Sequence, residues 1–130
     1  MTTFDRPSRA LDWAVKMFGQ VALDAKERAM RFTEEALELA HSLSVPRETV
    51  LALVDRVYSR PRGDVRQEVG QATMTLEVLA KAICINADDE ADKEFFRIQK
   101  IPQEVWQQRH AAKQAIGVAL PSHQSNTPGE

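Results

Sequence analysis

Residues 24–43, DAKERAMRFTEEALELAHSL, decide the fold of this chain. Apolar side chains recur in this stretch at steps of three and four residues, which is the period of an amphipathic α-helix. They are Ala29, Phe32, Ala36, Leu39, Ala40 and Leu43. The same stretch carries three glutamates close together, in the order Glu34-Glu35-Ala36-Leu37-Glu38. The pattern predicts a long helix that buries one face and holds a cluster of carboxylates beside it.

Helical periodicity continues along the chain, and no segment alternates polar and apolar residues as a strand would. Asp64 followed by Gln67 is typical of a capped helix start, and no internal repeat is evident. The sequence therefore predicts an all-α protein, a single-domain helical bundle over residues 1–116 with a motif-bearing core at about 24–100. Residues 117–130 are predicted to be a disordered tail. The five predicted helices cover residues 9–18, 24–43, 46–58, 64–83 and 89–101, and a further helical piece covers 103–116.

Composition excludes several classes of function. The 130-residue chain has a formal net charge of −2, whereas proteins that coat nucleic acids are usually basic. No apolar run approaches the ~18–20 residues of a transmembrane helix, and the N-terminus lacks the pattern of a signal peptide. The single cysteine, Cys84, lies between Ile83 and Ile85 and is expected to be a small buried hydrophobe. We predict a cytoplasmic protein that binds neither a membrane nor a nucleic-acid polymer.

The direction of each glutamate follows from the turn of about 100° per helical residue. Glu35 is predicted to border the apolar stripe of the 24–43 helix, Glu38 to lie one step further out, and Glu34 to face solvent. Glu68 is predicted to border the apolar stripe of the 64–83 helix in the same way. Two carboxylates that lose hydration on helices buried together would repel each other, so they need a compensating charge.

Two sources of that compensating charge remain open on spacing alone. A divalent cation, Mg²⁺ or Mn²⁺, suits hard carboxylate oxygens. Alternatively, Arg28, Arg31 or Arg66 neutralises the glutamates as an ordinary ion pair on a helix surface.

The stretch Glu34-Glu35-Ala36-Leu37-Glu38 followed by Glu68-Val69-Gly70-Gln71 resembles the EExxE and ExxD motifs of the MazG-like, all-α nucleoside triphosphate pyrophosphatases. The similarity covers roughly residues 24–100. It implies Mg²⁺-dependent hydrolysis of a nucleoside triphosphate to a monophosphate and pyrophosphate. It also implies Glu35, Glu38 and Glu68 as metal ligands, a water oriented by Glu34 or Glu38, and a homodimer or homotetramer.

Gln71 stands where the motif has its aspartate. An amide oxygen can coordinate a hard cation but brings no charge, so the predicted site holds one negative charge less. Gln71 is kept as the fourth predicted metal ligand. The substitution also favours an alternative function, a catalytically weakened or inactive nucleotide-binding or interaction module of the same fold. A purely structural bundle without a ligand is a third interpretation.

Basic residues follow one face of the 89–101 helix. MazG-like proteins often carry a lysine and an arginine four residues apart at this place, where they hold phosphates, and Lys93 and Arg97 have that spacing. The resemblance therefore implies Lys93 and Arg97 as substrate-binding residues. The alternative is a solvated helix face on which the two cations pair with Glu90 or Glu94.

Overall fold

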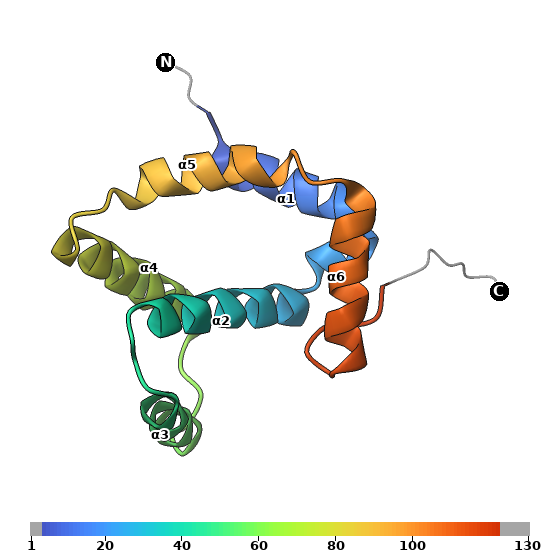
Figure 1. Cartoon of the computed structure of the whole chain (residues 1–130). Coiled ribbons are helices and arrows are strands. Elements are labelled where there is room, and N and C mark those ends of the chain that lie inside the picture. Colours follow the sequence, from blue (N-terminus) through green and yellow to red (C-terminus); the bar gives the residue numbers. More distant parts are fainter. Residues whose placement is uncertain (1–3, 123–130) are drawn as a thin grey trace. The chain divides into compact units, whose positions relative to one another are not determined.

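The computed structural model describes residues 4–122, which form helices joined by turns and short irregular segments and contain no strand (Figure 1). The prediction of an all-α protein is confirmed for these residues. Six α-helices are present, where the sequence predicts five and a further helical piece. The elements are α1 (Arg6–Phe18), the 3₁₀ helix η1 (Gly19–Leu23), α2 (Ala25–Ser42), α3 (Arg47–Tyr58), α4 (Val65–Ala82), α5 (Ala87–Ile98) and α6 (Gln103–Ala115).

Side-chain caps fix where the two long helices begin. Asp24 Oδ1 accepts the backbone N–H groups of Lys26 and Glu27 at 2.9 and 3.0 Å, and α2 starts directly after it. Asp64 Oδ2 accepts the N–H of Gln67 at 3.0 Å at the start of α4. Each carboxylate satisfies N–H groups that have no partner within the helix. The predicted start of the second long helix at Asp64 is confirmed.

The first helix begins earlier than predicted, at Arg6 instead of Arg9. Asp5 Oδ1 accepts the N–H of Ser8 at 3.2 Å, and this cap places the start of α1 upstream. The hydrogen bond to Ser8 also holds the pKa of the Asp5 carboxyl below its ordinary value. Pro7 lies in the first turn, where its missing N–H is not needed.

The chain divides into two compact units, residues 1–36 with 94–130 and residues 37–93. In the first unit, aromatic side chains of α1 and α6 pack together. The rings of Trp13 and Trp106 lie 5.1 Å apart at 85°, and Phe18 contacts Trp106 edge-on. Edge-to-face packing of this kind is favourable for aromatic pairs. Val21 and Ala22 of η1 are fully buried, so the core of this unit lies around η1, α1 and α6.

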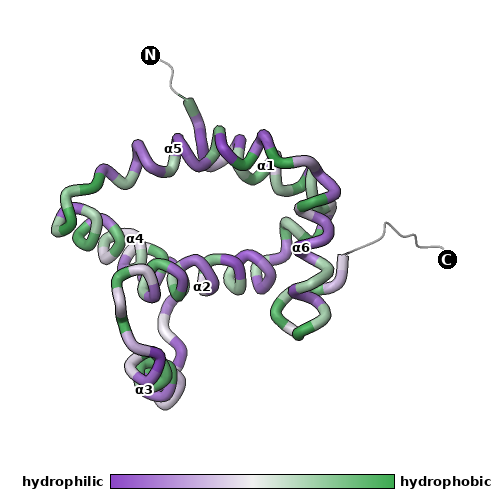
Figure 2. The backbone as a smooth tube through the Cα atoms, in the orientation of Figure 1, coloured by the Kyte–Doolittle hydropathy of each residue, from purple (hydrophilic) through white to green (hydrophobic). Residues whose placement is uncertain are grey.

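The second unit exposes most of its apolar side chains. None of the residues of α3 is buried, and Ala80 is the buried residue of α4. On α4, Val65 and Val69 are 75% and 61% exposed, although the sequence predicts that both are on a buried face. Hydrophobic positions recur along both helices (Figure 2). The predicted burial of the apolar stripe of α4, which includes Val65 and Val69, is therefore wrong for the single chain.

Two successive pairs of helices have the same lengths and spacing along the chain. The helices α4 and α5 are as long as α2 and α3, and each of their boundaries lies 40 residues later. The turns match as well, because Ser44 and Cys84 adopt positive φ angles of 66° and 61°. Val45 and Ile85 then donate their N–H groups to the carbonyl five residues back, at 3.0 and 2.9 Å, as in a Schellman motif. The structure thus contains a repeat that the residues alone did not reveal.

Cys84 is exposed, contrary to the prediction that it is buried. It lies in the turn after α4 and not on a helix face, so its apolar neighbours in the sequence do not enclose it.

Candidate functional site

The side of α2 that packs within the first unit is its charged side. Glu27, Arg31 and Glu34 lie at steps of four and three residues and therefore share one face of the helix. Glu27 is only 1% exposed, whereas Phe32 on the predicted buried stripe is 58% exposed. The sequence identified an apolar stripe correctly but assigned burial to the wrong face of this part of α2.

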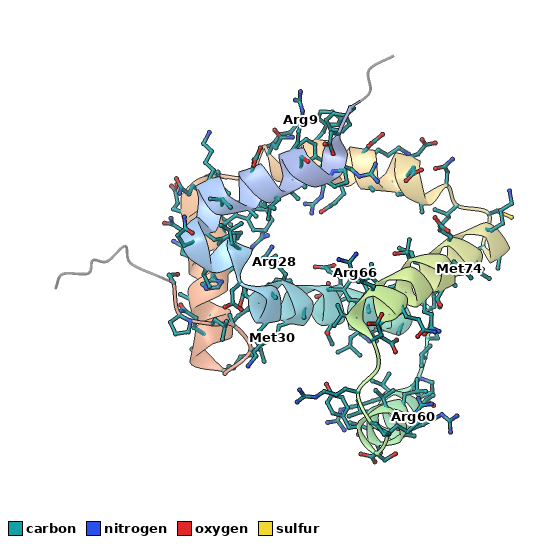
Figure 3. The ribbon with its side chains drawn as sticks, turned by 180° about the vertical axis from the view of Figure 1, so that it is seen from behind. Arg9, Arg28, Met30, Arg60, Arg66 and Met74 are labelled. Carbon is teal, nitrogen blue, oxygen red and sulfur yellow. The ribbon has the colours of Figure 1, made fainter. Side chains whose placement is uncertain are left out.

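The buried carboxylate of Glu27 is surrounded by donors and cations. Its Oε1 accepts the backbone N–H of Leu120 at 2.9 Å. Its Oε2 lies 3.5 Å from Arg31 Nε and 3.8 Å from both Arg28 Nη2 and His110 Nδ1. A buried charge persists only when it is paired in this way. Desolvation lowers the pKa of Arg28, which lies at the N-terminal end of α2 (Figure 3).

The segment after α6 is held in place by the same network. His110 Nε2 lies 2.9 Å from the carbonyl oxygen of Leu120, and Gln114 Nε2 donates to the same oxygen at 3.2 Å. The Arg31 guanidinium donates to the carbonyl of Val118. Val118 and Leu120, which fall in the predicted disordered tail, are therefore held by side chains of α2 and α6. Residues 123–130 of that tail lie outside the described residues.

The prediction that Glu34, the first glutamate of the acidic cluster, faces open solvent is wrong. Its Oε1 lies 3.0 Å from Lys113 Nζ and 3.5 Å from Arg31 Nη1, and its side chain is 35% exposed. The reason is that Lys113 of α6 reaches the polar side of α2, which the helical periodicity predicts to face water. Glu35 and Glu38 are exposed in the structure.

The predicted ligands Glu38, Glu68 and Gln71 belong to the second unit, and all three are exposed. Glu68 lies in the first turn of α4, where its carboxylate folds back against Gly63; a Cβ atom at residue 63 would collide with Glu68 Oε2. The remaining predicted metal ligand, Glu35, belongs to the first unit.

Carboxylate and amide oxygens are the donors that a hard cation prefers, so the chemistry of the predicted ligand set fits Mg²⁺. Among residues 4–122, however, no three histidine, cysteine, aspartate or glutamate side chains lie together in a way that could hold a metal ion. The metal site stays a prediction.

Lys93 and Arg97, the two cations predicted to bind phosphate, are each paired with a glutamate of α5. Lys93 Nζ lies 3.4 Å from Glu90 Oε2. Arg97 donates to both carboxylate oxygens of Glu94 at 2.8 and 2.6 Å, a bidentate pair. This pair holds the pKa of Glu94 below its ordinary value and raises that of Arg97. The pairing expected of a solvated helix face is thus present, and a phosphate would have to compete with it.

Comparison of the chain with models of known protein families, with curated proteins and with solved structures gives no match. Within the part of the chain that the structure describes, no helix combines the length and the apolar character needed to span a bilayer.

Proposed function

We propose that this protein is a Mg²⁺-dependent nucleoside triphosphate pyrophosphohydrolase. The observation that carries the proposal is the pair of acidic motifs, EExxE on α2 and Glu68 with Gln71 on α4, in a chain whose described part contains helices and no strand. Exposure of Glu35, Glu38 and Glu68 supports it, because oxygens that bind a metal and a triphosphate must be accessible.

The reaction joins the oxygen of a water molecule to the α-phosphorus and breaks the bond from that phosphorus to the oxygen bridging it to the β-phosphorus. Pyrophosphate leaves with that oxygen, and the water gives up its protons. Mg²⁺, when bound, polarises the phosphate and lowers the pKa of the attacking water. Glu35, Glu38, Glu68 and Gln71 would hold the ion. Glu38 or Glu34 would orient the water and accept its proton. Glu38 is the more accessible of these two, since Glu34 is paired with Lys113.

Lys93 and Arg97 would neutralise oxygens of the bound triphosphate, exchanging Glu90 and Glu94 for phosphate. The substrate proposed is thus a nucleotide, and the exposed apolar stripe of α4 supports assembly into a homodimer or homotetramer.

The direct test incubates the protein with a panel of nucleoside triphosphates and excess Mg²⁺ and measures pyrophosphate release. We expect release from at least one nucleotide, and a loss of about 10²-fold or more in kcat/KM in Glu68→Gln. Glu77→Gln is a matched control on the same helix, outside the motif, and it should retain activity. Absence of pyrophosphate from every nucleotide would overturn the catalytic proposal.

The second candidate is a nucleotide-binding or interaction module of the same fold. Such a module has lost its metal site and catalyses no hydrolysis. Gln71 favours it, because the site then lacks one carboxylate. Calorimetric titration with Mg²⁺ or Mn²⁺ separates the two candidates. Binding by the wild type that disappears in Glu35→Gln supports the hydrolase, and no binding by either protein supports the module.

A further inference from the structure

Positive charge is concentrated where α3 leads into α4. Residues 56–66, which we call the arginine segment, contain four arginines and one aspartate and so carry a net charge of +3 in a chain of formal net charge −2. The arginines are Arg56, Arg60, Arg62 and Arg66, and all four are exposed. The aspartate, Asp64, is occupied as the cap of α4. A local excess of positive charge attracts an anionic ligand.

The chain itself keeps Arg60 and Arg62 close together. Arg60 follows the end of α3, where its backbone N–H donates to the carbonyl of Val57 at 3.2 Å. Arg62 comes two residues later, so the two Cα atoms are at most about 7 Å apart. Arg66 lies in the first turn of α4, and Figure 3 labels it together with Arg60. Two guanidinium groups at this spacing can contact neighbouring phosphates of one ligand.

The side chains of Arg60 and Arg62 are available to such a ligand. Among residues 4–122, neither guanidinium takes part in a hydrogen bond or an ion pair. Lys93 and Arg97 of α5 differ in this respect, because each is paired with a glutamate. A phosphate that binds Arg60 and Arg62 therefore displaces water alone, whereas on α5 it must first break two ion pairs.

A carboxylate of the proposed metal site lies against the same segment. A Cβ atom at Gly63 would collide with Glu68 Oε2, so the Glu68 carboxylate lies over the backbone directly after Arg62. A nucleoside triphosphate with its metal needs both kinds of group, cations for the phosphate oxygens and carboxylates for the ion.

An exposed aromatic ring borders the arginines. Tyr58 is the last residue of α3, two residues before Arg60, and its side chain is 84% exposed. Nucleobases stack on aromatic rings that are accessible in this way. The ring beside unpaired cations therefore fits a nucleotide better than an anion without a base.

We propose that Arg60 and Arg62 bind the phosphates of a nucleoside triphosphate and that Tyr58 stacks on its base. The inference rests on the proposed function and adds substrate-binding residues to it. Arg66 adds positive charge at the start of α4. Because arginine binds phosphate without a metal, the segment binds the nucleotide in the absence of Mg²⁺ as well.

The test titrates the full chain with ATP and with inorganic tripolyphosphate in excess EDTA, by calorimetry. We expect the wild type to bind both below about 1 mM. Arg60→Gln combined with Arg62→Gln should weaken both about 10²-fold, because charge-assisted contacts are lost. The matched control, Arg47→Gln with Lys81→Gln, removes the same charge from exposed residues of the same unit and should weaken binding less than about threefold. Equal losses in the two variants, or no binding by the wild type, would overturn the inference.

Substitutions of Tyr58 test the contact with the base. Tyr58→Ala should weaken ATP about tenfold and leave tripolyphosphate unchanged, whereas Tyr58→Phe keeps the ring and should bind both as the wild type does. An equal effect of Tyr58→Ala on the two ligands overturns stacking. A single-stranded oligodeoxythymidine that binds more tightly than ATP would overturn a mononucleotide as the ligand.

Pyrophosphate release with Mg²⁺ separates this inference from the proposed function. If the wild type hydrolyses a nucleotide while the Arg60→Gln, Arg62→Gln variant binds ATP normally, the inference fails and the hydrolase stands. If these arginines bind ATP but no pyrophosphate is released, the hydrolase fails and the arginine segment stands as a nucleotide site.

Discussion

At the scale of single residues, Gln71 determines how much charge the predicted metal site can hold. Gln71→Asp restores the carboxylate of the motif and adds one unit of negative charge beside Glu68. We expect the affinity for Mg²⁺ to rise by about tenfold, as measured by calorimetric titration. Because residue 71 is exposed, the free energy of unfolding should change by less than about 0.5 kcal/mol.

Two controls make the result at residue 71 specific. Gln71→Asn shortens the amide without adding charge and should not strengthen binding. Gln67→Asp adds a carboxylate to the first turn of the same helix, outside the motif. A gain as large in Gln67→Asp as in Gln71→Asp would indicate general attraction of cations to α4 and would contradict Gln71 as a ligand position.

At the scale of elements, the two matching turns store backbone strain. Ser44 and Cys84 have positive φ angles of 66° and 61°, which a side chain with a Cβ adopts at a cost of about 1–2 kcal/mol. Ser44→Gly and Cys84→Gly should each raise the free energy of unfolding by about 0.5–1 kcal/mol, since glycine relieves the strain but loses more entropy on folding. Urea denaturation measures the change.

The control for the turn substitutions places glycine inside a helix. Ser42→Gly, in the last turn of α2, should lower the free energy of unfolding, because the helical conformation there strains no side chain. If Ser44→Gly and Ser42→Gly change the free energy of unfolding in the same direction, relief of strain does not explain the effect of Ser44→Gly. Cys84→Ser tests separately whether loss of the thiol changes the free energy of unfolding.

The elements also explain which expectations from the sequence were met. A cap such as Asp64 acts on an N–H three residues away, so the start of α4 could be predicted from local sequence. The buried face of α2 could not be predicted, because periodicity finds an apolar stripe without saying what packs on it. Glu27 contacts His110 of α6, and Glu34 contacts Lys113 of the same helix, and both partners lie more than 70 residues further along the chain. The spacing of Glu27, Arg31 and Glu34 was a visible signal, but on its own it matches any solvated helix face.

At the scale of the whole molecule, the apolar stripe of α4 lacks a cover within the described chain. Val69 is 61% exposed and Leu76 is 43% exposed, and large exposed apolar patches usually mark an interface. We expect the wild type to be a dimer or tetramer by light scattering coupled to gel filtration. Val69→Lys combined with Leu76→Lys should shift it to the monomer, since an unpaired charge in an apolar interface costs several kcal/mol. The matched control is Met74→Lys, which adds the same charge at an exposed apolar residue outside the stripe (Figure 3). A wild type that stays monomeric at tens of micromolar, or equal dissociation by Met74→Lys, would show that this stripe is not where copies of the chain meet.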